Sequence, residues 1–144
     1  MTAIATPQND WMAETRAVFA LLPEQPSPVL LIDEEEILSQ QRTWNAIGDL
    51  LRKWMRDPRA AIDDDYQAPT PLAIQRGLAW VGIWRDASSP TPTRMSPDGE
   101  GGVSFEWRRG QDFVEFLIEG SGLAELRVFS RCRLLRRVSY GQRS

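Results

Sequence analysis

The spacing of apolar residues changes once along the chain, after Gly101-Gly102, and this change restricts the fold more than any other feature. Before it, apolar residues recur at helical spacing. After it, Val103, Phe105 and Trp107 alternate with polar residues, as in a strand with one buried face. Helices followed by strands predict an α+β fold, with about three N-terminal helices packed on a C-terminal antiparallel meander of three to four strands.

Two helices are expected in the first 60 residues. The first runs from about Trp11 to Leu22 and ends at the proline that follows. The second begins after Asp33, which has the spacing of a capping box with Glu36, and it ends before Pro58. Acidic residues in its first turn and basic residues in its last turn suit the helix dipole.

A third helix is expected from Pro71 to about Asp86. Thr70 is a suitable N-cap, and proline is favoured at the first helical position. This helix is apolar around most of its circumference, so it is expected to be the most buried of the three, with Trp80 or Trp84 in the core.

Three strands are expected between residues 102 and 129, joined by turns at 109–112 and 120–122. The segment 131–140 fits a fourth strand or a short helix, and its periodicity favours neither. The 144 residues suit a single domain. Its expected parts are a flexible terminus at 1–8, a helical half at 9–86, a loop at 87–101 and a strand-rich half at 102–140.

The composition excludes several kinds of active site. The chain has no histidine and one cysteine, Cys132. Catalytic triads that use histidine, imidazole zinc sites, paired-cysteine redox sites and intrachain disulfides are therefore excluded, and we expect no metal and no cofactor. A small carboxylate-dependent hydrolase remains an alternative if two of Glu106, Glu115 and Glu119 converge in an aromatic cleft. The acidic run at 63–65 is expected to be a solvated loop and not a cation site.

No apolar run is long enough for a signal peptide or a membrane span, so we expect a cytoplasmic protein with no membrane partner. The single unpaired cysteine fits a reducing compartment.

A glycine-rich segment, Pro97–Trp107 (PDGEGGVSFEW), precedes and enters the first strand. Gly99, Gly101 and Gly102 form a candidate anion nest, because glycine permits the backbone angles that bring amides together. A tight entry into the strand explains the same glycines. This segment resembles one shared by short bacterial proteins that have a helical first half and a GG-apolar-x-apolar-Glu-Trp strand near the end. The resemblance covers about residues 95–129. It implies this fold and a bacterial source, and it suggests a small accessory partner of a neighbouring effector or toxin.

Positive charge is concentrated at the C-terminus, where the last 25 residues hold six arginines and one acid, Glu125. We expect the arginines to form a partner-binding surface on an open sheet face, flanked by Phe129 and Tyr140. Intramolecular pairing with the acids at 33–36 or 63–65 is the alternative. The candidate partner-binding residues are Arg108, Arg109, Arg131, Arg133, Arg136 and Arg137.

These observations predict a non-enzymatic bacterial protein that binds another protein, as an antitoxin, an immunity protein or an accessory subunit does. An acidic surface or a neighbouring effector is the expected partner, since arginine pairs with carboxylates in a bidentate manner. The alternative is a nucleic-acid-binding module that uses the C-terminal arginines. The acidic isoelectric point, about 5.0, favours the protein partner.

Overall fold

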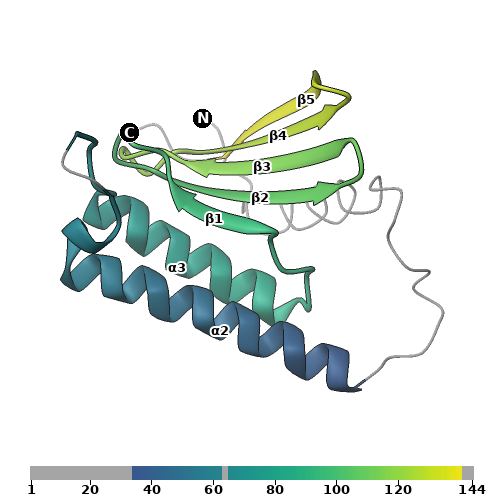
Figure 1. Cartoon of the computed structure of the whole chain (residues 1–144), viewed down its shortest axis with the longest axis horizontal. Helices are drawn as coiled ribbons and strands as arrows, with labels where there is room; N and C mark the ends of the chain where they lie inside the picture. Colours follow the sequence, from purple (N-terminus) through teal and green to yellow (C-terminus); the bar gives the residue numbers. More distant parts are fainter. Residues whose placement is uncertain (1–33, 63–64, 141–144) are drawn as a thin grey trace, which may run out of the picture.

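The computed structural model describes residues 34–62 and 65–140. The helix expected from Trp11 to Leu22 lies outside these residues, as do Asp33 and the first two acids of the run at 63–65. Figure 1 shows the described elements. In chain order they are α2 (Glu34–Arg56), the short 3-10 helix η1 (Pro58–Ala60), α3 (Pro71–Asp86), β1 (Arg94–Pro97), β2 (Val103–Arg109), β3 (Asp112–Ile118), β4 (Ala124–Ser130) and β5 (Arg133–Tyr140).

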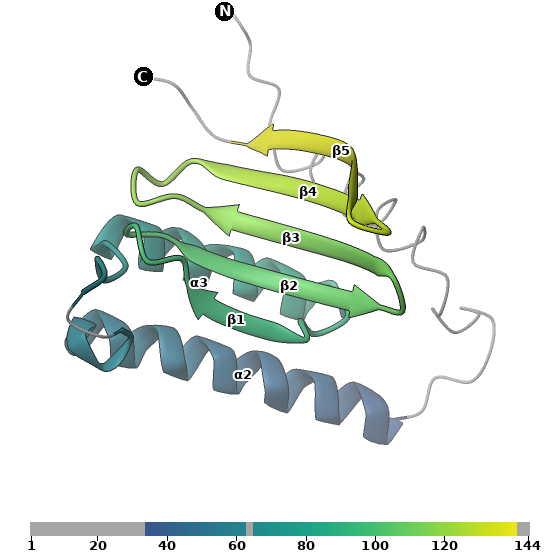
Figure 2. The same ribbon diagram turned by 45° about the horizontal axis from the view of Figure 1, so that its top comes forward.

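The described residues form an α+β fold of two layers, in which α2 and α3 cover one face of an antiparallel sheet (Figure 1). The sheet is a meander with the strand order β1-β2-β3-β4-β5, so β1 and β5 are its edges (Figure 2). It has five strands where three to four were expected: β5 is the possible fourth strand at residues 131–140, and β1 is the additional one.

The bounds of α3 agree with those expected from the sequence. The Thr70 hydroxyl accepts a hydrogen bond from the amide of Ala73 at 3.0 Å, as an N-cap does, and Pro71 follows at the first helical position. In α2, the acidic first turn and the basic last turn also agree with the expected dipole pattern.

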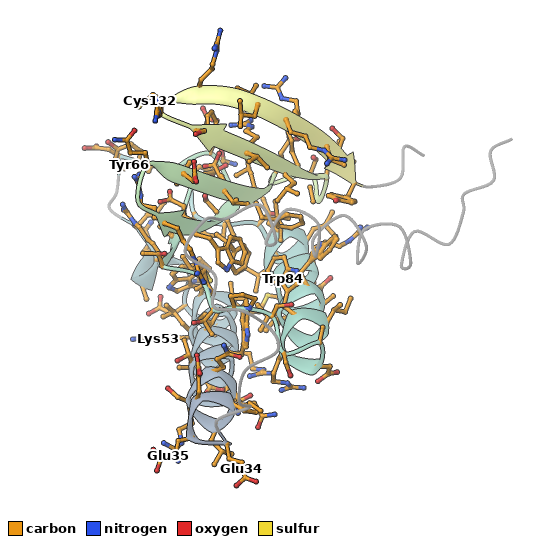
Figure 3. All side chains as sticks on the ribbon, turned by 90° about the vertical axis from the view of Figure 1, so that its right-hand side faces the viewer. Glu34, Glu35, Lys53, Tyr66, Trp84 and Cys132 are labelled. Atoms are coloured by element: carbon orange, nitrogen blue, oxygen red, sulfur yellow. The ribbon has the colours of Figure 1, made fainter. Side chains whose placement is uncertain are left out.

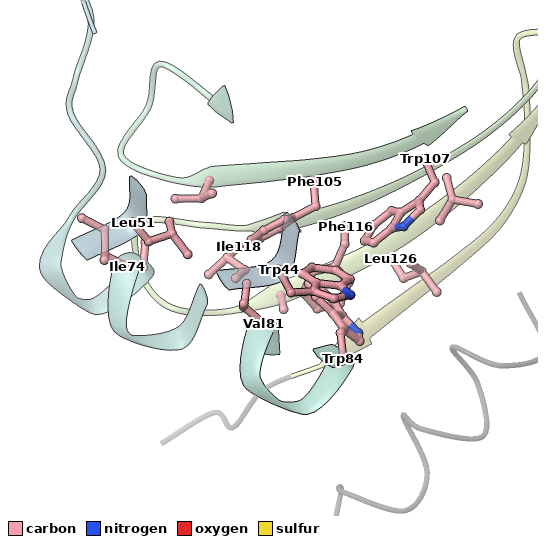
Figure 4. Packing of buried hydrophobic residues seen from close by; sticks show 14 of the residues in the cluster. Trp44, Leu51, Ile74, Val81, Trp84, Phe105, Trp107, Phe116, Ile118 and Leu126 are labelled. Carbon is pink, nitrogen blue, oxygen red and sulfur yellow. The ribbon is translucent and has the colours of Figure 1, made fainter. Parts of the chain in front are cut away.

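The core lies between the helices and the sheet and is rich in aromatic rings. Trp84 on α3 has an exposed fraction of 1% and meets the rings of Phe105, Trp107 and Phe116 edge to face, with centroids 5.0–5.4 Å apart (Figure 4). Trp44 on α2 packs against Trp84 at 5.6 Å. The expectation that Trp80 or Trp84 is buried is therefore confirmed for Trp84, whereas Trp80 is only half-buried.

The expectation of a loop through residues 87–101 was wrong for β1. This strand pairs with β2 in the register Met95 to Phe105 and Pro97 to Val103. Four residues are too few to show a period, and proline is tolerated here because β1 is an edge strand. The segment that was left undecided between strand and helix contains β5, which pairs with β4.

The alternation in the strands separates a covered face from an open face. Val103, Phe105 and Trp107 are buried against the helices, as expected, and the register places them opposite buried residues of β3. We call the other side, which the intervening residues of the same strands occupy, the open face. Its residues on the three central strands are Ser104, Glu106, Arg108, Phe113, Glu115, Leu117, Glu125, Arg127 and Phe129.

Candidate binding surface

The sheet has two ends of different construction. At one end, which we call the hairpin end, two-residue turns connect β2 to β3 and β4 to β5; it comprises residues 108–113 and 129–135. At the other, the loop end, longer loops meet the start of α3; it comprises residues 65–70, 98–102 and 119–123. The backbone amide of Arg131 donates to the carbonyl of Gln111 at 3.0 Å, so the two hairpins are held together.

The turn between β4 and β5 has an unusual backbone. Arg131 and Cys132 occupy its two positions with φ angles of 52° and 67°, in the left-handed region. Two-residue turns of this type favour Asn-Gly, because side chains beyond glycine, asparagine and aspartate are strained there. At the β2–β3 turn, by contrast, a glycine, Gly110, takes the positive φ of 60°.

A β-bulge follows this turn and presents two leucines. Phe129 pairs with Leu134 and Val128 pairs with Arg136, so Leu135 is the extra residue on β5. Leu134 and Leu135 have exposed fractions of 44% and 61%. They are the large apolar residues that this end of the sheet leaves most open to solvent.

An aromatic pair continues this apolar area across the open face. Phe113 and Phe129 are directly opposite each other on β3 and β4, their ring centroids are 5.5 Å apart, and both are half-buried. The guanidinium of Arg108 lies 4.6 Å from the centroid of the Phe113 ring, a cation–π contact. We use the name hairpin surface for two groups of residues: Arg108, Phe113, Phe129 and Leu134 on the open face, and Arg131, Arg133 and Leu135 of the β4–β5 hairpin, where Arg133 lies on the covered side of the sheet.

Four of the six predicted partner-binding arginines lie at the hairpin end. Arg108 is on the open face, Arg109 ends β2 opposite Asp112, and Arg131 and Arg133 flank Cys132 in and after the β4–β5 turn. Figure 3 looks toward this end and shows Cys132 at the top of the molecule. Glu34 and Glu35, which begin α2, are at the bottom of the same view. These two acids are therefore remote from the hairpin surface.

The other two predicted arginines lie in the middle of β5, on opposite faces. Arg136 is opposite Val128, on the side of the covered face, whereas Arg137 is opposite Arg127 on the open face. Arg137 forms an ion pair with Glu125. The structure therefore brings Arg108, Arg109, Arg131 and Arg133 to one end and places Arg136 and Arg137 farther along the strand.

Ion pairs occupy the middle of the open face. Arg127 binds Glu115 at 3.3 Å and Glu125 at 3.2 Å, and all three side chains are less than one-third exposed. The hydrogen bond that Arg127 donates to Glu125 and the charges of both carboxylates raise the pKa of Arg127, although burial opposes this. Ser104 donates a further hydrogen bond to Glu115 at 3.1 Å. The register places Glu106 directly opposite Glu115, so two of the three candidate acids do converge on the open face. However, Ser104 and Arg127 bind the carboxylate of Glu115, and the tryptophan rings of the core lie on the covered face, so the geometry does not favour the carboxylate hydrolase.

At the loop end, the glycine-rich segment that was a candidate anion nest binds a carboxylate of its own chain. Gly99 and Gly101 have φ angles of 84° and 95°. The amides of Glu100 and Gly102 both donate to Oδ1 of Asp98 at 2.7 Å. An external anion would have to displace this carboxylate, so the nest residues Gly99, Gly101 and Gly102 serve the loop's own structure.

Thr70 joins three segments at the loop end. Its hydroxyl donates to the carbonyl of Gly120 at 2.7 Å, and its amide donates to the carbonyl of Gly101 at 2.9 Å. A pocket of about 520 Å³ lies beside these contacts. Three of the lining side chains are acidic and one, Arg127, is basic. The lining residues are Gln67, Thr70, Asp98, Glu100, Leu117, Glu119, Gly120, Ser121 and Arg127.

Tyr140 does not flank the arginine surface in the expected way. It lies opposite Ala124 on the covered face and contacts the rings of Trp80 and Phe116. Burial raises its pKa to about 12, although the charge of Arg136 opposes this shift. Phe129, the other expected flanking residue, does lie on the open face.

Residues 34–62 and 65–140 contain no group of three or more acidic or cysteine side chains arranged to hold a metal ion. None of the helices in this part of the chain is long and apolar enough to cross a membrane. The chain matches no protein-family model, no curated protein and no solved structure. Its function must therefore be inferred from the geometry of the two ends of the sheet.

Sequence reasoning identified Phe129 but missed the other apolar residues of the hairpin surface, Phe113, Leu134 and Leu135. Val114, Phe116 and Ile118 occupy every second position of the sequence, and strict alternation places Phe113 on the opposite face, so this residue could have been found. Alternation could not have identified Leu135, because this residue is exposed as the extra residue of a β-bulge, and the bulge interrupts the alternation.

Proposed function

We propose that this protein is a non-enzymatic binding module that contacts an acidic surface of another protein through its hairpin surface. The observation that carries the proposal is the juxtaposition of two exposed leucines, a half-exposed phenylalanine pair and several arginines at one end of the sheet. Aromatic residues and arginine are enriched where protein interfaces gain most of their affinity. Exposed apolar side chains with a charged rim are typical of such a surface.

The backbone of the β4–β5 turn supports the same conclusion. The left-handed region costs roughly 1–2 kcal/mol for an ordinary residue, and Arg131 and Cys132 both adopt it. Strained residues concentrate where their side chains are needed for contact. A turn of Asn-Gly would relieve the strain but would remove the arginine from the hairpin tip.

An acidic protein fits this surface better than a nucleic acid does. Phosphate contacts would use the arginines but would leave Leu134 and Leu135 without an apolar partner. The chain as a whole is acidic, whereas nucleic-acid-binding domains are usually basic.

The resemblance of the PDGEGGVSFEW segment supports a more specific form of the proposal. On this basis the protein is a small bacterial accessory, antitoxin or immunity protein, acting in the cytoplasm on a neighbouring effector. The small size and the absence of histidine from the chain agree with a role in binding.

The single cysteine permits a direct test, because it lies exposed at the tip of the hairpin surface. A benzophenone group attached to Cys132 can be photo-crosslinked in a lysate of the source organism, and the product can be identified by mass spectrometry. We expect one protein to be crosslinked, through a peptide rich in aspartate and glutamate.

The matched control moves the same probe to the loop end, in a Cys132→Ser, Ser121→Cys variant. Ser121 is also exposed and lies in a turn. Equal crosslinking of the same protein from both positions, or a product that disappears after nuclease treatment, would contradict the proposal. Loss of the product after Leu135→Arg, with an unchanged melting temperature, would support it.

A further inference from the structure

The outer edge of β5 is the longest strand edge without a neighbouring strand in the part of the chain that the structure describes. β5 has eight residues and pairs with β4 alone among the described strands. Every second backbone amide and carbonyl of such a strand points away from its partner, and these groups can form hydrogen bonds with another extended chain. Six of its eight residues are exposed.

The opposite edge of the sheet is not equivalent. β1 has four residues, and Pro97 at its end lacks an amide donor. Short edge strands and prolines discourage further pairing, so β1 is protected and β5 is the edge suited to strand addition.

The side chains of β5 define the chemistry of a strand that could pair with it. Arg133 and Arg136 are opposite Ser130 and Val128, so the bulge brings both arginines to the same face of the sheet. Leu134 lies on the other face, opposite Phe129. A chain that alternates acidic and apolar residues would place carboxylates beside Arg133 and Arg136 and an apolar side chain beside Leu134. Arg137 lies on the face of Leu134, where Glu125 of the same chain pairs with it.

A second copy of this chain does not fit the edge well. β5 has three arginines and no acid. A symmetric antiparallel pairing of two β5 strands, centred on the middle of the strand, places either Arg136 or Arg137 opposite the same residue of the other copy, and like charges directly opposite each other are destabilising. The arginines therefore discourage self-association and favour an acidic strand.

We propose that an extended segment of the partner, alternating acidic and apolar residues, pairs with β5 as a sixth strand of the sheet. The proposal rests on the proposed protein-binding function and specifies how the partner is held. Backbone hydrogen bonds supply affinity in such strand addition, and alternate side chains supply specificity.

The test uses three synthetic eight-residue peptides and the full chain. The first alternates glutamate and valine. The second has the same sequence with every second backbone amide methylated, on the edge intended to pair, so that its charges and side chains are kept but its donors are removed. The third has lysine in place of glutamate. Binding is followed by fluorescence anisotropy, and protection of the β5 amides is followed by hydrogen exchange.

We expect the glutamate peptide to bind and to slow exchange in β5 but not in β1. The methylated peptide should bind at least tenfold more weakly, and the lysine peptide should not bind. Arg133→Glu should weaken binding at least tenfold, whereas Arg76→Glu, an exposed substitution on α3, should leave it within twofold.

Equal binding of the methylated peptide would overturn strand addition, because only side-chain charge would then hold the peptide. Absence of binding by the glutamate peptide would also overturn it. So would full protection, in the free protein, of the β5 amides that point away from β4. None of these results bears on the crosslinking from Cys132, which tests the binding function separately.

Discussion

The loop end and the hairpin end belong to the same strands, but their polar groups differ in what they contact: those of the loop end bind within the chain, whereas those of the hairpin end are exposed. At the loop end, Asp98 and Thr70 make five hydrogen bonds through their side chains and the Thr70 amide, all within the chain. At the hairpin end, Arg131 and Arg133 are exposed beside exposed leucines. The first end therefore joins helix α3 to the sheet, whereas the second offers groups that suit another molecule.

Residues that stabilise the fold and residues suited to binding therefore lie at different ends of the sheet. The most distinctive sequence motif, the glycine-rich segment, is at the end that stabilises the fold. The hairpin end, which has no comparable sequence motif, has the exposed apolar and basic side chains expected of an interface. We therefore expect substitutions at the loop end to lower the free energy of unfolding, and substitutions at the hairpin end to change partner binding while leaving that free energy unchanged or higher.

The largest effect is expected from Gly102→Ala at the loop end. A Cβ there would lie 2.4 Å from the carbonyl oxygen of Ile118 and 2.6 Å from Oδ2 of Asp98. The backbone oxygen cannot move without disturbing the pairing of β2 and β3, so we expect a loss of about 3 kcal/mol in the free energy of unfolding. Urea denaturation measures this loss.

The control is Gly82→Ala, on α3. A Cβ at Gly82 would have no heavy atom within 4 Å, and alanine is the better helix former, so this variant should gain about 0.5–1 kcal/mol. A Gly102→Ala variant as stable as the wild type would show that the loop end is less tightly packed than the geometry indicates.

The second effect concerns Asp98, whose carboxylate accepts two short hydrogen bonds from backbone amides. Asp98→Ala should lower the free energy of unfolding by about 2 kcal/mol, because charge-assisted bonds to two amides are lost. Asp112→Ala at the hairpin end is the matched substitution, and it should change stability by less than about 0.5 kcal/mol. Similar losses for the two variants, measured by thermal denaturation, would remove the distinction between the ends.

The sequence predicted the fold where short-range signals agree with the tertiary structure. Thr70-Pro71 specified the start of α3 because the cap is local, and strict alternation specified the faces of β2 and β3. The edges could not be predicted. β1 is a strand because β2 lies beside it, and β5 carries a bulge that breaks its period.

The candidate site was predicted only in part, for related reasons. Charge alone identified arginines such as Arg131 and Arg133, and alternation could have identified Phe113. The occupation of the nest by Asp98 depends on backbone angles that a sequence does not contain. The left-handed turn at Arg131-Cys132 was also unpredictable, because these residue types disfavour it.

The third expected effect is a gain in stability, from substitutions in the β4–β5 turn at the hairpin end. Replacing the β4–β5 turn by Arg131→Asn with Cys132→Gly should raise the free energy of unfolding by about 1 kcal/mol, because both new residues adopt positive φ more easily. The same variant should bind the partner more weakly, since it loses an arginine from the hairpin surface. Stability is measured by urea denaturation, and binding by competition with the protein labelled at Cys132. A variant that is destabilised, or that competes as well as the wild type, would contradict this trade-off.

The smallest effect on stability is expected from the exposed arginines themselves. Arg131→Gln with Arg133→Gln should change the free energy of unfolding by less than about 0.5 kcal/mol, because exposed charges away from special contacts contribute little. Arg137→Gln is the informative comparison. Arg137 is ion-paired with the partly buried Glu125, so this substitution should lower the free energy of unfolding by more than the double substitution does. Partner binding should weaken in the double variant, and the wild type should lose more affinity than the variant when salt is raised, because exposed charges are screened beyond about 8 Å at physiological ionic strength. If the double variant unfolds instead, Arg131 and Arg133 support the fold, and the hairpin end does not differ from the loop end in the way that its exposed groups indicate.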